Sequence, residues 1–173
     1  MKKHPLYIIC FLTILGIISA SLLSIVNSIT APIIKVNALT GLKEELSKYD
    51  ITLDKINENV SKVDKVLNIY EGNHKINGKC YIFEIEEKQS LVKEPFSIFV
   101  VIDESDGTIV TFYSSDIYAN EGYDDKFDGV DFGVIGTNKD NFENSFENVA
   151  DATYTSNAFK DAFKVAFEQY GKM

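Results

Sequence analysis

The sequence opens with a long uncharged stretch from Pro5 to Ile34, in which most positions are Ile, Leu, Val, Phe or small residues. A helix needs roughly 20 such residues to cross the hydrocarbon core of a bilayer, so this stretch is long enough to span one. A cleaved signal peptide is the competing interpretation, but its apolar region usually has about 7–15 residues. The sequence therefore predicts a transmembrane helix over residues 5–30, in contact with the lipid bilayer.

Lysines on the two sides of this stretch predict its orientation. Lys2 and Lys3, with the terminal amino group, outweigh the single nearby Lys35 on the other side. Positive charge favours the cytoplasmic side of a membrane. We therefore expect a single-pass protein of the cell membrane, with residues 1–4 in the cytoplasm and one extracytoplasmic domain over residues 31–173.

The composition outside the apolar stretch argues against nucleic acid as a partner. Of the 17 basic residues, all lysines, two precede the stretch, which leaves 15 against 26 acidic residues. A binder of nucleic acid needs clustered cations to neutralise phosphates. The two cysteines are Cys10, inside the stretch, and Cys80, so no disulfide within the domain is expected and Cys80 is predicted to be a half-buried strand residue.

The middle of the chain predicts strands joined by short turns. Val66 to Tyr70, Lys79 to Glu86 and the apolar run from Phe96 to Ile102 have the length and composition of strands. Ser105-Asp106-Gly107 predicts a tight turn before a further strand from Thr108 to Tyr113, because Asp-Gly between two β-rich runs is a strong hairpin signal.

Apolar residues at three- and four-residue spacing predict helices on either side of these strands. One would begin at Thr30-Ala31-Pro32, with a cap hydroxyl and a first-turn proline, and continue to Tyr49. A weaker repeat runs from Ile56 to Leu67, after a break at Asp50 to Thr52, and an amphipathic helix runs from Ala158 to Tyr170. The expected fold is α+β: one N-terminal transmembrane helix, then a single domain with an antiparallel sheet flanked by helices.

Few side chains form a recognisable site. His4 and His74 have no evident nucleophile or metal partner nearby in the sequence. Four carboxylates in the acidic stretch from Ser114 to Asn148 suggest a calcium loop, but their spacing does not match that of an EF-hand, and a solvated acidic loop is favoured. They are Asp124, Asp125, Asp128 and Asp131. No set of acid, base and nucleophile stands out, so a stand-alone enzyme is not expected.

The most informative stretch is Asp151 to Ala158, which precedes the last predicted helix. Its hydroxyls, on Thr153, Thr155 and Ser156, stand at a junction between loop and helix. Helix capping is one interpretation, since Ser and Thr accept hydrogen bonds from free amides there. A phosphate site is the other, because the same amides and the helix dipole favour an anion. Local chemistry leaves both open.

The chain as a whole resembles the FMN-binding domain proteins, among them the subunits with this domain in the Rnf-type electron transport complex and in the sodium-translocating NADH:quinone oxidoreductase. The resemblance covers nearly the full length and rests on three stretches. They are the anchor with Thr30-Ala31-Pro32-Ile33, the strand–turn–strand from Phe99 to Ile109, and Ala152-Thr153-Tyr154-Thr155-Ser156-Asn157-Ala158, which is similar to the signature Gly-Ala-Thr-x-Thr-Ser-x-Ala.

In that family the threonine after Gly-Ala carries FMN through a phosphoester bond that a dedicated flavin transferase installs. The resemblance therefore implies covalent FMN on Thr153, with Ala152, Thr155 and Ser156 in the cofactor-binding turn. Two departures stand out: Asp151 replaces the usual glycine, and the family's Glu-Thr-Pro-Gly-Leu-Gly loop is reduced to Asn120-Glu121-Gly122-Tyr123. Glycine allows the backbone to approach a phosphate closely, which aspartate does not.

The resemblance implies a membrane-anchored flavoprotein that transfers electrons within a membrane redox complex. Its partners would be the other subunits of that complex and the flavin transferase that matures it. The alternative is a flavin-free structural or assembly subunit with a degenerate FMN-binding domain, which Asp151 and the reduced loop favour. The electron donor and acceptor, and any coupling to ion transport, do not follow from the residues.

Overall fold

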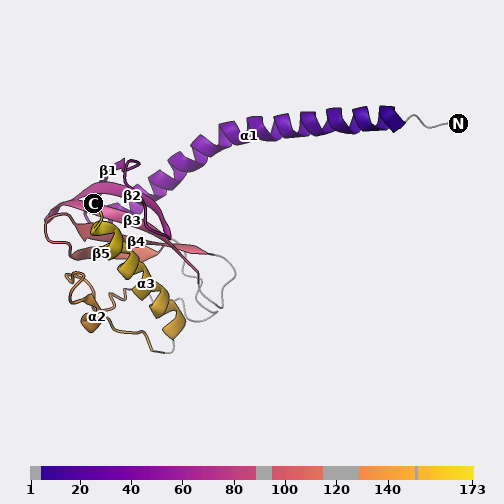
Figure 1. Ribbon diagram of the computed structural model, residues 1–173. Helices are drawn as coiled ribbons and strands as arrows, with labels where there is room; N and C mark the ends of the chain where they lie inside the picture. Colours follow the sequence, from indigo (N-terminus) through magenta and orange to yellow (C-terminus); the bar gives the residue numbers. More distant parts are fainter. Residues whose placement is uncertain (1–4, 89–94, 115–128, 151) are drawn as a thin grey trace. The chain divides into compact units, whose positions relative to one another are not determined.

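The computed structural model describes residues 5–88, 95–114, 129–150 and 152–173 (Figure 1). The chain divides into two units, residues 1–45 and residues 46–173. The elements in chain order are α1 (Pro5–Ser47), β1 (Ile51–Ile56), β2 (Val66–His74), β3 (Gly78–Glu87), β4 (Phe96–Asp103), β5 (Ile109–Ser114), α2 (Phe142–Ser145) and α3 (Thr153–Tyr170).

The first unit consists of most of α1. Within it, Ile8–Thr30 is long and apolar enough to cross a membrane, and none of its most apolar window is buried. The hydroxyls of Thr13, Ser21, Ser28 and Thr30 donate to carbonyls of their own helix, as Ser21 does to Ile17 over 2.8 Å. A helix in lipid must satisfy its polar groups internally in this way. The length and composition of this helix are therefore those of a single-pass membrane anchor.

The predicted helix start at Thr30-Ala31-Pro32 is wrong, because α1 continues through it without interruption. The Thr30 hydroxyl donates to the Val26 carbonyl over 2.9 Å and therefore does not cap a new helix. A proline removes one backbone hydrogen bond but does not have to end a helix whose flanking residues remain helical. The break predicted at Asp50 to Thr52 is confirmed: Asp50 has a φ of 57°, and β1 begins at Ile51.

The second unit is built on a five-stranded sheet in which each strand pairs antiparallel with the next along the chain. This confirms the predicted antiparallel sheet and α+β fold. The helix predicted from Ile56 to Leu67 is wrong: Ile56 ends β1, and Leu67 lies in β2. Val60 and Val63 lie in the intervening loop and pack against the core, so their spacing reflects burial in a loop.

Helix α3 crosses one face of the sheet and forms the main core with it (Figure 1). Phe163 and Ala162 of α3 are fully buried, as are Phe83 and Val100 of the sheet. Strand β4 is buried on both faces, which accounts for its nearly continuous apolar sequence. On the face away from α3, the ring of Tyr113 stacks on that of Phe99, with ring centroids 4.6 Å apart.

Candidate functional site

The predicted cofactor turn lies at the start of α3. Thr153 is the first residue of the helix, and the buried Ala152 occupies the position before it, with φ −124° and ψ 38°. The Ser156 amide donates to the Ala152 carbonyl over 3.0 Å and closes the first turn. The first amides of an α-helix generally lack acceptors in a preceding turn and carry the positive end of the helix dipole, so a turn of this kind can receive an anion.

The three hydroxyls of this turn have different surroundings. Thr153 is exposed, whereas Thr155 is 5% exposed and Ser156 is fully buried. The Ser156 hydroxyl donates to the Ala152 carbonyl and accepts from the Val149 amide, each over 3.1 Å. Ser156 therefore fastens the preceding loop to the helix, and Thr153 is the hydroxyl of the three that a modifying enzyme can reach.

The interpretation of this turn as a simple hydroxyl cap is wrong. Ala152 occupies the N-cap position and has no side-chain oxygen with which to accept an amide hydrogen bond. Thr153 comes one position too late to act as the cap. The exposed aromatic ring of Tyr154 follows it, with 61% of the residue accessible. A hydroxyl at the N-cap position therefore does not account for the polar character of the turn, and the assignments of Thr153, Ala152, Thr155 and Ser156 to a cofactor stay predictions.

A segment that includes α2 runs along α3 beside this turn. Going away from Thr153, the Val149 amide contacts Ser156, the Lys160 ammonium lies 5.3 Å from the centroid of the Phe146 ring, and Lys164 forms an ion pair with Glu143. The Lys164 Nζ and Glu143 Oε1 atoms are 2.9 Å apart. The hydrogen bond from Lys164 lowers the pKa of the Glu143 carboxyl, and the charge of Lys160 contributes in the same direction.

Aromatic rings hold this segment in place. The Phe146 ring stacks on the Phe132 ring, with centroids 5.3 Å apart and planes 7° apart. Phe132 in turn contacts Phe159 of α3 and Phe112 of β5. Because Phe132 is buried and Phe146 is partly exposed, the cluster presents one ring at the surface beside Lys160. The Lys160–Phe146 contact and helix α3, which begins with the predicted cofactor turn, therefore pack on the same aromatic cluster.

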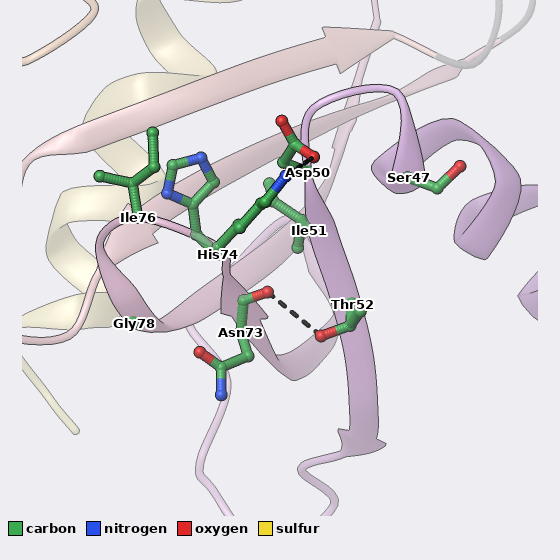
Figure 2. Close-up of a pocket in the computed structure, with 9 residues that line it drawn as sticks. Ser47, Asp50, Ile51, Thr52, Asn73, His74, Ile76 and Gly78 are labelled. Atoms are coloured by element: carbon green, nitrogen blue, oxygen red, sulfur yellow. Dashed lines mark hydrogen bonds and ion pairs between the residues drawn. The ribbon is translucent and has the colours of Figure 1, made fainter.

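A separate surface hollow of about 490 Å³ lies where β1 meets the turn between β2 and β3 (Figure 2). Its lining includes Asp50, whose carboxylate is 3.7 Å from the Lys75 ammonium, and Thr52, whose hydroxyl donates to the Asn73 carbonyl over 3.2 Å. No lining residue belongs to α3 or to the loop before it. The hollow is therefore distinct from the predicted cofactor turn.

His74 and Cys80 each have a role in the local structure of the sheet and its turn. His74 lines the hollow, and its Nδ1 accepts a hydrogen bond from the Asn77 amide, as expected for a turn histidine. Cys80 is 1% exposed, more deeply buried than predicted, and burial raises the pKa of its thiol to about 12 with a further contribution from Asp103. A thiol with so high a pKa is unreactive at neutral pH.

Several predicted features lie outside the described residues. They are His4, Asp151, the Asn120 to Tyr123 loop, and Asp124, Asp125 and Asp128 of the acidic stretch. Asp131 is described, and its carboxylate accepts from the Gly133 amide in a local turn. Within the described part of the chain, no group of His, Cys, Asp and Glu side chains is arranged to hold a metal ion.

Sequence reasoning missed the contact between Lys160 and Phe146. The helical spacing of Thr153, Lys160 and Lys164 was a usable signal, since positions seven and eleven residues apart share one helix face. Nothing in the sequence predicted that Glu143 and Phe146 would pack beside that face, because such contacts between distant segments depend on the tertiary fold.

Comparison with known proteins bears on the same region. No curated protein matches the chain. Residues 92–168 match the model of the FMN-binding domain family. The matched stretch contains β4, β5 and α2, and it includes most of α3, with Thr153 and Lys160 within it. The match supports an FMN-binding domain in this chain, and the exposed Thr153 at the start of α3 lies inside the part that is similar to that family.

Proposed function

We propose that this chain is a membrane-anchored electron-transfer subunit that carries FMN on Thr153 through a phosphoester bond. The observation that carries the proposal is the difference among the three hydroxyls of the turn: Thr153 is exposed, while Thr155 and Ser156 are buried. The turn lies within the stretch that matches the FMN-binding domain family.

The residues at the start of α3 suit such a cofactor. The Thr153 oxygen would hold the phosphate, and the amides of the first turn would face the phosphate oxygens. Ser156 would keep that turn in shape through its bonds to Ala152 and Val149. Bound FMN supplies the redox chemistry, and the protein supplies position and electrostatics. A covalent bond would keep the cofactor attached where free FMN is not assured.

The N-terminal helix supports a place at the membrane. Ile8–Thr30 would span the bilayer, and Lys2 and Lys3 favour a cytoplasmic N-terminus, which places the domain outside. In this position the domain would pass electrons between redox centres of neighbouring subunits in a membrane complex, such as one of the Rnf type. A flavin transferase would act on the exposed Thr153 during maturation.

The test is the intact mass of the protein after co-expression with the native flavin transferase, with in-gel flavin fluorescence alongside. We expect an adduct of the mass of FMN that maps to Thr153. Thr153→Ala should abolish the adduct, whereas Thr155→Ala, which removes a buried hydroxyl from the same turn, should retain it. Circular dichroism establishes that both variants are folded. An unmodified wild-type mass would overturn the covalent form of the proposal.

A flavin-free structural or assembly subunit is the second candidate function. Asp151 favours it, because aspartate adds a side chain and a negative charge where the family has glycine. Asp151→Gly separates the two candidates. Flavin on the Asp151→Gly variant but not on the wild type would indicate that Asp151 has cost the site its cofactor. Equal flavin loading of both proteins would exclude the flavin-free subunit.

A further inference from the structure

The helix face that begins at Thr153 continues through Asn157, Lys160 and Lys164, and we call these four residues the Thr153 strip. At 3.6 residues per turn, the three later positions lie within about 40° of Thr153 around the helix axis. The strip therefore places two ammonium groups in line with the exposed hydroxyl.

The two lysines of the strip have different partners. Lys164 is neutralised by Glu143, at 2.9 Å. Lys160 lies over the Phe146 ring, and among the residues that the structure describes it has no carboxylate within ion-pair distance. A cation over an aromatic face is held by a weaker attraction than a cation bound to a carboxylate. Lys160 acts on the Glu143 carboxylate only at longer range, so it is the lysine of the strip that forms no ion pair with a described residue and can interact with another group.

The position of Lys160 suits the far end of a cofactor attached at Thr153. The two residues are seven positions apart, which is roughly 10 Å along a helix axis. The Cα–Cβ bonds of a helix tilt toward its N-terminus, so the Lys160 side chain leaves the backbone on the side of Thr153, and its ammonium lies over the Phe146 ring. In FMN the ribityl chain separates the phosphate from the isoalloxazine ring, so a cation further along the helix from Thr153 is better placed to act on the ring than one beside the phosphate.

We propose that Lys160 sets the electron affinity of the flavin: its ammonium group would stabilise the negative charge that the isoalloxazine ring gains on reduction. This inference rests on the proposed attachment of FMN to Thr153. Charge near the ring nitrogens is one of the means by which a protein tunes a flavin. At a protein surface, one charge within about 10 Å changes an equilibrium on the order of tenfold.

The experiment measures the midpoint potential and the absorption spectrum of the flavin on the full-length protein, matured with its native transferase. The variants are Lys160→Met, Lys160→Arg and, as the matched control, Lys164→Met, which removes the same charge from the same strip one turn further on. In Lys160→Met we expect the equilibrium constant for reduction to fall about tenfold, a drop of roughly 30 mV for two electrons. Lys160→Arg should restore the wild-type potential, and Lys164→Met should cause less than half of the drop.

The other outcomes are distinguishable. Equal potentials in the wild type, Lys160→Met and Lys164→Met would overturn the role of Lys160 and leave the proposed function intact. A folded Lys160→Met chain without flavin would also overturn it, because the Lys160 charge would then be needed for the attachment of FMN and not for its potential. Absence of flavin from the wild type would overturn the proposed function, and the inference with it.

Discussion

The Glu87 carboxyl is an ionisable group whose surroundings link protonation to folding. Glu87 is 4% exposed, and both of its carboxylate oxygens accept hydrogen bonds from the Lys65 ammonium, at 2.9 and 3.0 Å. Burial raises the pKa of Glu87, and the bonds from Lys65 offset only part of that effect. The side chain of Lys65 is 42% exposed, so water keeps its charge solvated while the carboxylate is desolvated.

We predict that Glu87→Gln removes part of the pH dependence of stability. Because the pKa of Glu87 is higher in the folded state than its ordinary value of 4.5, the folded protein holds this proton more tightly. This contribution to stability is fully present below about pH 4.5 and is lost as the pH rises through the raised pKa. Urea unfolding of the wild type from pH 4 to pH 8 should show this loss, and the variant should not.

Glu86→Gln is the control for this prediction, since it removes an equal charge from the exposed neighbouring position. It should follow the wild-type pH profile. A Glu87→Gln profile parallel to that of the wild type would mean that the carboxyl is better solvated than its burial indicates.

At the scale of elements, the start of α3 depends on the segment from Gly129 to Ala150. The segment turns sharply at Gly133, whose φ is +69°, and a Cβ there would lie 2.5 Å from the Ser145 carbonyl oxygen. Next to this close approach, the Glu147 amide donates to the carbonyl of Phe132, the residue before Gly133, over 2.9 Å. The close backbone approach at Gly133 therefore brings Phe146 and Val149 into register with α3.

Gly133→Ala and Gly136→Ala form a matched pair of predictions. Both glycines have a positive φ, but a Cβ at Gly136 would meet nothing within 4 Å. The left-handed backbone costs an alanine about 1 kcal/mol at either position. At Gly133 the clash with the Ser145 carbonyl should add a further 1–3 kcal/mol, roughly the cost of overpacking. Free energies of unfolding from urea titration should therefore be lower for Gly133→Ala; equal values would contradict the close approach.

For the whole molecule, the question is which side of a membrane holds the domain. Ile76, at the turn between β2 and β3, is 85% exposed, so a cysteine there would react readily. Cys80 is buried with a raised thiol pKa, and Cys10 can be replaced by serine to remove the other thiol. This background provides a single reporter on the domain without altering the charges that flank the anchor.

We predict that Ile76→Cys in the Cys10→Ser background is labelled by a membrane-impermeant maleimide on intact cells. The reason is that Lys2 and Lys3 favour the cytoplasmic side for the N-terminus and so place the domain outside. His4→Cys in the same background should be labelled only after lysis. The reverse pattern would place the domain in the cytoplasm, and labelling of both on intact cells would indicate leaky membranes.

Local chemistry was enough to predict the elements with strong periodicity or turn signals. The C-terminal helix is confirmed as α3, and the hairpin at Asp106-Gly107 is confirmed, with Gly107 at a φ of +70°. The two wrong helix predictions failed where local signals were ambiguous. At Pro32 the helix on both sides outweighed a start signal, and at Val60 and Val63 an apolar spacing belonged to a loop that covers the core.

By itself the sequence determined the long apolar N-terminal helix, four of the five strands and the turn that contains Thr153, because each depends on residues adjacent along the chain; strand β1 (Ile51–Ile56) was not predicted. Only the tertiary structure decided that Ser156 is buried while Thr153 is exposed, and that Lys160 meets Phe146. These features depend on how the segment from Gly129 to Ala150 packs against α3. Burial and contacts between distant segments arise from the folded core as a whole, which no local pattern encodes.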